Sequence, residues 1–378
     1  MIINYQDFCR TGIEFCHSDV LKKLYIDTSG QNVVFIMSGS AAKRFLWEDA
    51  IKEWQKRGRL LWISDSVSYP TQETLLMGME KIKGFDADVI IAAGGGSSID
   101  FAKGMKAFYG IREDCTVEAI TECLTAKKVA MGEKNIRLIA IPTTAGTGAE
   151  LTQWATIWDV RKKCKYSIDH PALKPDKAII IPELTVMADE KLTISTGLDA
   201  LAHAVEAYWS KKTNPLIRSL ASEAVREMAS YLPGLLKEPE NLYYREKQCT
   251  ASVLSGLAFS MTRTTACHSI SYPLTMNYGI PHGIAAAMTL EKVAERNSGY
   301  YQEETALMDL FQSFGNIGNF LQEICSGRVS LYLKDYGIEK RDISLIVQKA
   351  FTLGRMDNNP KELCSEDVES ILCEIYEA

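Results

Sequence analysis

Four residues that could bind a divalent metal ion occur in two stretches of the second half of the chain. Asp199 and His203 are four residues apart in the Ala- and Leu-rich stretch LDALAHAVE, so on a helix their side chains would lie one turn apart on the same face. His268 and His282 follow in a second helical region, which glycine interrupts. One carboxylate and three imidazoles suit Zn²⁺ or Fe²⁺, and these ligand types do not discriminate between the two ions.

Each of these residues also has a purely structural interpretation. Asp199 and His203 could form a hydrogen-bonded pair on a packing face of the helix, and His268 and His282 could be hydrogen-bonded core or loop residues. The chain contains only five histidines, and three of them fall in these stretches. Because a glycine-rich loop accompanies them, the combination favours a metal site.

That loop, residues 94–96, is a run of three glycines between the apolar segment VIIAA and a segment of helical character. Backbone without side chains at the start of a helix can approach a pyrophosphate and donate its free N–H groups to it. Ser97 could cap the helix and donate its hydroxyl. The alternative is a tight turn without a ligand, because the run matches neither GxGxxG nor GxxxxGK[S/T].

A second polar loop, PTTAGTGAE at residues 142–150, follows another apolar segment. Its hydroxyl groups could line the adenine or the nicotinamide ribose of a dinucleotide. An ordinary Gly/Thr turn explains it equally well.

Apolar segments alternate with helical segments in the first half of the chain, which is typical of a parallel sheet covered on both faces. From residue 188 onward only helical periodicity is found. We therefore predict an α/β N-terminal domain with a Rossmann-like parallel sheet (residues 1–184), which would carry the cofactor, and an all-α C-terminal helical domain (residues 185–378), which would carry the metal. The predicted strands cover residues 33–37, 60–63, 89–93, 137–141 and 177–181, and predicted helices cover 41–56 and 101–109.

The composition argues against several classes of partner. A net charge of −6 over 378 residues gives no basic field for nucleic acid. No apolar stretch reaches the length of a membrane span, and the first residues lack the pattern of a signal peptide. The ten cysteines contain no CxxC pair and have no regular spacing, which indicates reduced thiols and not a disulfide framework. We expect a cytoplasmic enzyme acting on small molecules, with no nucleic-acid or membrane partner.

The motifs GGGSSID, PTTAGTGAE, STGLDALAHAVEAY and PHG together resemble the iron-containing (group III) alcohol dehydrogenases, relatives of glycerol dehydrogenase and, more remotely, of dehydroquinate synthase. The resemblance implies the dehydroquinate synthase-like fold of that family, a homodimer or larger homo-oligomer, and a metal ion that polarises an aldehyde carbonyl while NAD(P)H delivers hydride. It implies these site residues: Asp199, His203, His268 and His282 for the metal; Gly95, Gly96, Ser97 and Asp100 for the pyrophosphate region; Thr143, Thr144 and Thr147 for the nicotinamide half; and Lys165 and Leu184 for the riboses or adenine.

Two positions depart from the family pattern. Many members have a further histidine four residues after the third metal ligand, where it helps to relay the proton, and this chain has Tyr272 there. Tyr272 or water could replace that histidine, or Tyr272 could be a core aromatic residue beside Pro273. Arg263 stands in a segment that is usually Gly-rich. Its guanidinium suits a carboxylate or phosphonate, unless it is a surface or inter-helix pairing residue.

The block RTTACHSISYPLTMNYGIPHG, together with TQWATIWD at residues 152–159, is most similar to the phosphonoacetaldehyde reductase subgroup. This resemblance implies reduction of phosphonoacetaldehyde to 2-hydroxyethylphosphonate in phosphonate biosynthesis, with Arg263 on the phosphonate. The alternative within the family is a general short-chain alcohol, aldehyde or diol dehydrogenase. A dehydroquinate-synthase-like lyase fits the motifs less well, and so does a non-catalytic nucleotide-binding or redox-sensing protein with Cys267 as a metal-site thiol.

The end of the first predicted strand bears on the choice of cofactor. Enzymes that prefer NADH typically place an acidic residue there, whereas a 2′-phosphate requires that this charge is absent. The chain reads SGSAAKR, with no acid. We predict NADPH, with NADH as the alternative, and place Gly39, Ser40 and Lys43 near the phosphate; Lys43 could also be a solvated helix residue. The metal is predicted to be Fe²⁺ or Zn²⁺.

Overall fold

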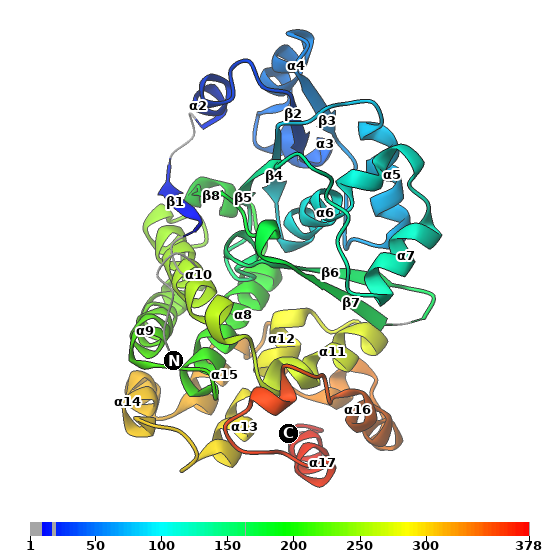
Figure 1. Ribbon diagram of the computed structural model, residues 1–378. Coiled ribbons are helices and arrows are strands. Elements are labelled where there is room, and N and C mark those ends of the chain that lie inside the picture. Colours follow the sequence, from blue (N-terminus) through cyan, green and yellow to red (C-terminus); the bar gives the residue numbers. More distant parts are fainter. Residues whose placement is uncertain (1–9, 17–19, 163, 378) are drawn as a thin grey trace. The chain divides into compact units, whose positions relative to one another are not determined.

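A computed structural model describes residues 10–16, 20–162 and 164–377, which form two compact units (Figure 1). The first unit comprises Met1–Thr144 and Ala149–Thr185, and the second comprises Ala145–Gly148 and Val186–Ala378. The division along the chain thus falls after Thr185. The short loop of residues 145–148 also belongs to the second unit, although it lies within the predicted first domain, residues 1–184.

A six-stranded parallel sheet forms the first unit, with the strand order β1-β8-β5-β4-β2-β3 (Figure 1). This confirms the predicted fold class, and each of the predicted strands is present within one or two residues. An edge strand and an antiparallel hairpin of two strands were not predicted. The strands of the sheet are β1 (Gly12–Phe15), β2 (Val33–Ile36), β3 (Leu60–Ile63), β4 (Val89–Gly94), β5 (Arg137–Pro142) and β8 (Lys177–Ile180), and those of the hairpin are β6 (Trp154–Asp159) and β7 (Cys164–Asp169).

Helices cover both faces of this sheet because side chains alternate along each buried strand. Val34 and Ile36 pack on one face among residues of α5, α6 and α7, whereas Val33 and Phe35 pack on the other among residues of α2, α3 and α4. The sheet is therefore buried on both sides, as its continuous apolar strands require. The helices are α2 (Val20–Asp27), α3 (Gly39–Arg44), α4 (Glu48–Lys56), α5 (Gln72–Ile82), α6 (Gly96–Ala107) and α7 (Val117–Thr125).

The prediction of a single helix over residues 41–56 is wrong. The chain forms α3 and α4, and between them Leu46 adopts φ 59° and is largely exposed. A left-handed residue cannot continue an α-helix. Ser38 caps α3 by accepting a hydrogen bond from the Ala41 N–H, so α3 begins directly at the end of β2.

The second unit is helical, and its described residues contain no strand, as predicted. Helix α8 is its centre: nearly all of its side chains are buried, and it contacts α9, α10 and α12. Asp189 caps α8 through the Leu192 N–H. The helices are α8 (Glu190–Trp209), α9 (Pro215–Lys237), α10 (Leu242–Thr262), α11 (Ala266–Tyr278), α12 (His282–Ala287), α13 (Leu290–Asn297), α14 (Glu304–Met308), α15 (Ile317–Cys325), α16 (Ile343–Lys349) and α17 (Ser365–Glu374).

None of the helices within the described ranges is both long enough and apolar enough to cross a membrane.

Candidate active site

Three of the predicted metal ligands meet inside the second unit. Asp199 lies on α8, His268 on α11, and His282 is the first residue of α12. One side-chain donor atom from each lies within 4.8 Å of the other two. The Nε2 atom of His268 is 3.3 Å from Oδ1 of Asp199, and both side chains are almost completely buried. A carboxylate and two imidazoles at this spacing form a donor set that fits a divalent ion.

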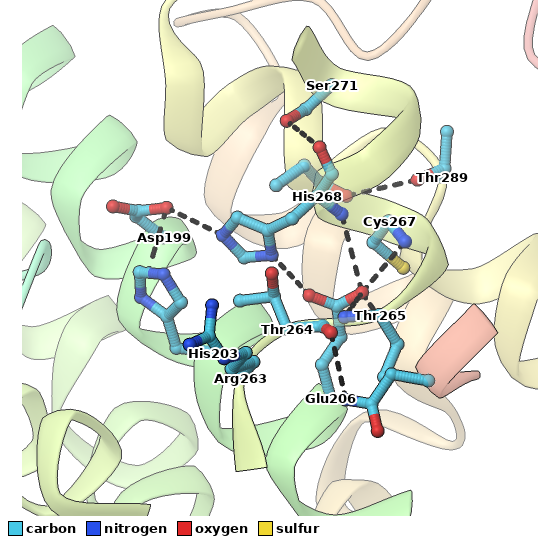
Figure 2. A network of polar contacts seen from close by, with 12 residues as sticks. Asp199, His203, Glu206, Arg263, Thr264, Thr265, Cys267, His268, Ser271 and Thr289 are labelled. Atoms are coloured by element: carbon cyan, nitrogen blue, oxygen red, sulfur yellow. Dashed lines mark hydrogen bonds and ion pairs between the residues drawn. The ribbon is translucent and has the colours of Figure 1, made fainter. Parts of the chain in front are cut away.

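His203, the fourth predicted ligand, lies one helical turn after Asp199, with its Nδ1 atom 4.0 Å from Oδ1 of Asp199 (Figure 2). Its ring is stacked between two other rings, with centroid distances of 3.9 Å to Phe259 and 4.3 Å to His268. Nδ1 also lies 3.4 Å from the carbonyl oxygen of Gly146. A proton on Nδ1 would leave Nε2 as the atom that can bind an ion.

Glycine allows two segments to approach α8 at this site. A Cβ atom at Gly283, beside His282, would overlap the carbonyl oxygen of Ser195. A Cβ atom at Gly146 would overlap the carbonyl oxygen of Thr196 in the same way. The absence of a side chain at both glycines therefore allows their backbone to pack directly against α8, and any other residue would force the two apart.

The protonation of the site follows from its burial and its charges. Burial lowers the pKa of His203 to about 3, so this imidazole is neutral. Burial also raises the pKa of Asp199, but the imidazoles of His203 and His268 hold it well below the ordinary value. For His268, burial lowers the pKa, yet Glu206 and Asp199 together raise it to about 10. Without an ion, a protonated imidazole therefore lies between two carboxylates.

The second of these carboxylates, Glu206, was not predicted as a site residue. It is completely buried, and its Oε2 atom pairs with Nδ1 of His268 (Figure 2). The signal was present in the sequence, because Asp199, His203 and Glu206 follow the spacing of one helix face. An acidic residue one turn beyond a ligand histidine is a candidate partner for a further ligand.

Tyr272 and His282 have nearly parallel rings, with a centroid distance of 5.8 Å and an interplanar angle of 4°. Tyr272 is half-buried, and its ring lies beside that of His282, a predicted metal ligand. Cys267 is completely buried, and burial raises the pKa of its thiol well above the ordinary value. That environment disfavours a reactive thiolate.

Arg263 ends α10 in an unusual backbone conformation, with φ 65° and ψ 177°. Its N–H donates to the Phe259 carbonyl at 2.7 Å. Asn358 holds the bend by donating to the carbonyl oxygens of Thr262 and Thr264 at 2.9 and 3.1 Å. Figure 2 draws Arg263 among the residues of the polar network around Glu206 and His268.

In the first unit, the predicted nucleotide loops lie at the carboxyl ends of neighbouring strands. The chain passes from β2 to β3 on one side and returns to β4 on the other, so β2 and β4 flank a topological switch point, where α/β sheets bind their ligands. Gly39 and Ser40 follow β2, and Gly95 and Gly96 follow β4. The Thr143 N–H, at the end of β5, donates to the Gly94 carbonyl at 3.0 Å.

A Cβ atom at position 95 would lie 3.4 Å from Oγ1 of Thr144, an ordinary van der Waals contact, so packing alone does not require glycine there. The predicted capping of α6 by Ser97 is wrong. Gly95 is the N-cap, no side chain caps the helix, and the Ser97 hydroxyl donates to the Ser68 carbonyl at 2.7 Å. The first N–H groups of α6 therefore have no side-chain acceptor at the cap, which suits an anion.

Other predicted cofactor residues have structural partners. The Asp100 carboxylate accepts a hydrogen bond from the Thr156 N–H at 2.9 Å, which ties α6 to the hairpin. Burial raises the pKa of Asp100 to about 6, although Lys103 and, more weakly, Lys165 on β7 oppose the shift. The Leu184 side chain is buried in the apolar core. Thr147 lies in the loop that belongs to the second unit. Cofactor contacts of these residues stay predictions.

Models of one protein family match both units. The model described as iron-containing alcohol dehydrogenase matches residues 16–182, and the model described as Fe-containing alcohol dehydrogenase family, C-terminal, matches residues 193–376. The chain belongs to the iron-containing alcohol dehydrogenase family. It is therefore an oxidoreductase that acts on alcohols or aldehydes, in a family that uses NAD(P) and a metal ion.

Individual members of the iron-containing alcohol dehydrogenases are similar over most of the chain. An NADPH-dependent butanol dehydrogenase of Clostridium saccharobutylicum is 30% identical over 365 residues, 92% of each chain. A phosphonoacetaldehyde reductase of Streptomyces viridochromogenes is 31% identical over 227 residues, covering 60% of this chain and 58% of that protein. The crystal structure of sulfoacetaldehyde reductase from Bifidobacterium kashiwanohense in complex with NAD⁺ superposes with a TM-score of 0.83 at 28% identity, covering 97% of each chain.

Proposed function

We propose that this protein reduces a small aldehyde with an anionic substituent to the primary alcohol, using NADPH and a divalent metal ion, and that phosphonoacetaldehyde is the substrate. The product would be 2-hydroxyethylphosphonate. The observation that carries the proposal is Arg263, a cationic residue fixed in a left-handed bend five residues before the ligand His268. Two of the similar proteins named above act on two-carbon aldehydes that carry a phosphonate or a sulfonate.

The metal would be held by Asp199, His268 and His282, with His203 as the fourth ligand. When bound, the ion supplies Lewis-acid polarisation of the carbonyl, and the reduced nicotinamide supplies hydride. Water has little access to three of these side chains, because Asp199, His203 and His268 are each at most 5% exposed. The neutral His203 and the ionised Asp199 are in the protonation states that bind a cation.

Arg263 would bind the anionic end of the substrate. A guanidinium presents parallel N–H donors that match phosphonate or sulfonate oxygens. A non-glycine residue at φ 65° costs about 1 kcal/mol of conformational strain, so a bend of this kind is retained where the side chain has a use. Asn358 maintains the bend by donating hydrogen bonds to the carbonyl oxygens of Thr262 and Thr264.

Tyr272 would deliver the proton to the alkoxide oxygen, directly or through water. Its phenol carries an exchangeable proton next to a metal ligand, and the parallel stacking on His282 fixes the ring. This is the position at which many family members have a histidine.

NADPH is proposed because the strand end at Ser38–Ser40 has no carboxylate to repel a 2′-phosphate. The similarity to an NADPH-dependent butanol dehydrogenase supports this choice, whereas the sulfoacetaldehyde reductase structure contains NAD⁺. The test is the ratio of kcat/KM for NADPH to that for NADH. We expect a ratio above 10 in the wild type and a reversed preference in Gly39→Asp, because the new carboxylate would bind the ribose hydroxyls.

A general alcohol dehydrogenase is the second candidate. It is favoured by the full-length similarity to a butanol dehydrogenase, whose substrate has no charged group. The two candidates differ in a single measurable quantity, which is the preference for an anionic over an uncharged aldehyde of similar size.

The experiment compares NADPH consumption with phosphonoacetaldehyde, sulfoacetaldehyde and propanal by the Fe²⁺-loaded protein under anaerobic conditions. We expect phosphonoacetaldehyde to be preferred, and Arg263→Ala to lower kcat/KM for it by about 10- to 100-fold while propanal turnover is unchanged. Arg226→Ala, at an exposed arginine of α9, is the matched control. Equal turnover of propanal and phosphonoacetaldehyde by the wild type would reject the anionic substrate and favour the general dehydrogenase.

A further inference from the structure

Glu206, on α8, is a carboxylate with no contact to solvent. Burial of an ionised carboxylate is costly unless several donors surround it. The donors that surround the Glu206 carboxylate and compensate its burial all belong to one segment, Thr265–His268.

One oxygen of Glu206 holds the beginning of α11. Oε1 accepts hydrogen bonds from the N–H groups of Thr265, Cys267 and His268 at 3.1, 2.8 and 3.3 Å, and from the Thr265 hydroxyl at 2.7 Å (Figure 2). Thr265 is the N-cap of α11 but provides no side-chain cap of its own. A carboxylate from α8 thus replaces the missing cap, and its charge is favourable at a helix N-terminus.

The other oxygen holds the imidazole. Oε2 of Glu206 pairs with Nδ1 of His268, and the same ring directs Nε2 towards Oδ1 of Asp199, 3.3 Å away. A carboxylate can only accept, so the proton of this pair lies on Nδ1. The lone pair that an ion requires is then available on Nε2 once that nitrogen is deprotonated.

We propose that Glu206 is the positioning residue for the metal ligand His268. By holding both the α11 backbone and Nδ1, it fixes the place, the rotation and the tautomer of the imidazole. This inference rests on the metal site of the proposed function. Glu206 itself contributes no ligand, since its two oxygens are taken by the α11 segment and by Nδ1.

Glu206→Gln separates the two tasks of the side chain. The amide oxygen can still accept from the α11 N–H groups, so the cap is retained. The NH₂ group then faces Nδ1 and can only donate, which moves the imidazole proton to Nε2, the nitrogen needed by the ion. Thr265→Val is the matched control, because it removes one donor to Glu206 and the hydroxyl that accepts from Trp209 without touching the imidazole pair.

The measurement is the Kd for Zn²⁺, obtained by competition with a chromophoric chelator on the metal-free full chain. We expect Glu206→Gln to raise the Kd by about 10- to 100-fold, and Thr265→Val to lower the Tm while changing the Kd less than about threefold. Equal affinity of Glu206→Gln and wild type would overturn this inference alone. A wild-type chain that binds no Zn²⁺ would overturn the proposed metal site as well.

A second measurement does not depend on the folding of the variant. In wild-type protein labelled with ¹⁵N-histidine and loaded with Zn²⁺, we expect the His268 ring to show a protonated Nδ1 and a metal-bound Nε2. The reverse assignment would overturn the inference.

Discussion

Asp199 and His268 lie 69 residues apart in the chain, yet Oδ1 of Asp199 is 3.3 Å from Nε2 of His268. The two residues are on separate helices, and neither is exposed by more than 3%. Without an ion, the charge of Asp199 is compensated by the imidazole of His268, whose pKa, lowered by burial, is raised to about 10 by Glu206 and Asp199. A divalent ion would take over this compensation, which supports our proposal that a cation binds here.

The first prediction concerns His203 as the fourth ligand. His203→Phe retains a flat ring between Phe259 and His268 but removes the nitrogen atoms. We expect the affinity for Zn²⁺ or Fe²⁺ to fall by at least about 100-fold, with little change in the Tm of the metal-free protein. Phe259→Leu is the control, which should lower the Tm and leave the affinity within a few-fold. Unchanged metal affinity in His203→Phe would reduce the site to Asp199, His268 and His282.

A second prediction separates strain from substrate binding at Arg263. Both Arg263→Gly and Arg263→Ala remove the guanidinium, but only glycine adopts φ 65° without strain. We expect the glycine variant to be more stable than the alanine variant by about 1 kcal/mol, or about 2–4 °C in Tm for a domain of this size. Both should lose the preference for phosphonoacetaldehyde to the same extent. Equal Tm values would mean that the bend relaxes when Arg263 is replaced.

Tyr272 gives the third prediction. Tyr272→Phe retains the ring that stacks on His282 and removes the phenol. If the phenol delivers the proton, kcat should fall by about 100-fold with little change in KM, and Tyr272→His should retain most of the activity. Steady-state kinetics over a range of pH values checks this. Wild-type kcat in the phenylalanine variant would indicate that water alone supplies the proton.

The fourth prediction is a pH dependence of stability in the first unit. Burial raises the pKa of Glu150 from the ordinary value of 4.5 to about 7, although Lys103, which is also buried, opposes the shift. Since the folded pKa is above the unfolded one, the stabilising contribution of Glu150 is present below pH 4.5 and is lost as the pH rises to about 7. Glu150→Gln removes this dependence, so its stability relative to wild type should increase by about 2–3 kcal/mol across that window.

Thermal unfolding between pH 4.5 and pH 8 measures this difference, with Glu133→Gln at an exposed carboxyl as the control. Parallel pH profiles for wild type and Glu150→Gln would show that Glu150 ionises in the folded protein as easily as in the unfolded chain.

The central part of the fold could be predicted from the sequence because its strands are continuous apolar runs. Strands β2, β4 and β5 are buried on both faces, and a run such as VIIAA is unambiguous between helical segments. Strand β1 has only four residues at the edge of the sheet, and its side chains are partly exposed, so it cannot be distinguished from a loop. Every second residue of β6 is buried, and a strand could have been predicted from the alternation of residues in WATIWD.

Some residues of the candidate site could likewise be predicted from the sequence, whereas their partners could not. Asp199, His203, His268 and His282 could be proposed from residue type and spacing, and the structure brings three of them within 4.8 Å. The spacing of Glu206 places it on the same helix face as Asp199 and His203, but its partners could not be identified, because they lie at the start of a helix that begins 60 residues later in the chain. Ser97 and Asp100 fit a sequence motif, but their hydrogen bonds to Ser68 and Thr156 depend on the packing of α6.

The most direct measurement is the dependence of aldehyde reduction on bound metal. The protein is stripped with a chelator, Fe²⁺ or Zn²⁺ is added back in known amounts, and NADPH oxidation is followed with phosphonoacetaldehyde. The account predicts no turnover in the stripped protein and a rate that rises with added metal and saturates at one ion per chain. Undiminished turnover by stripped protein that retains no measurable metal would contradict it.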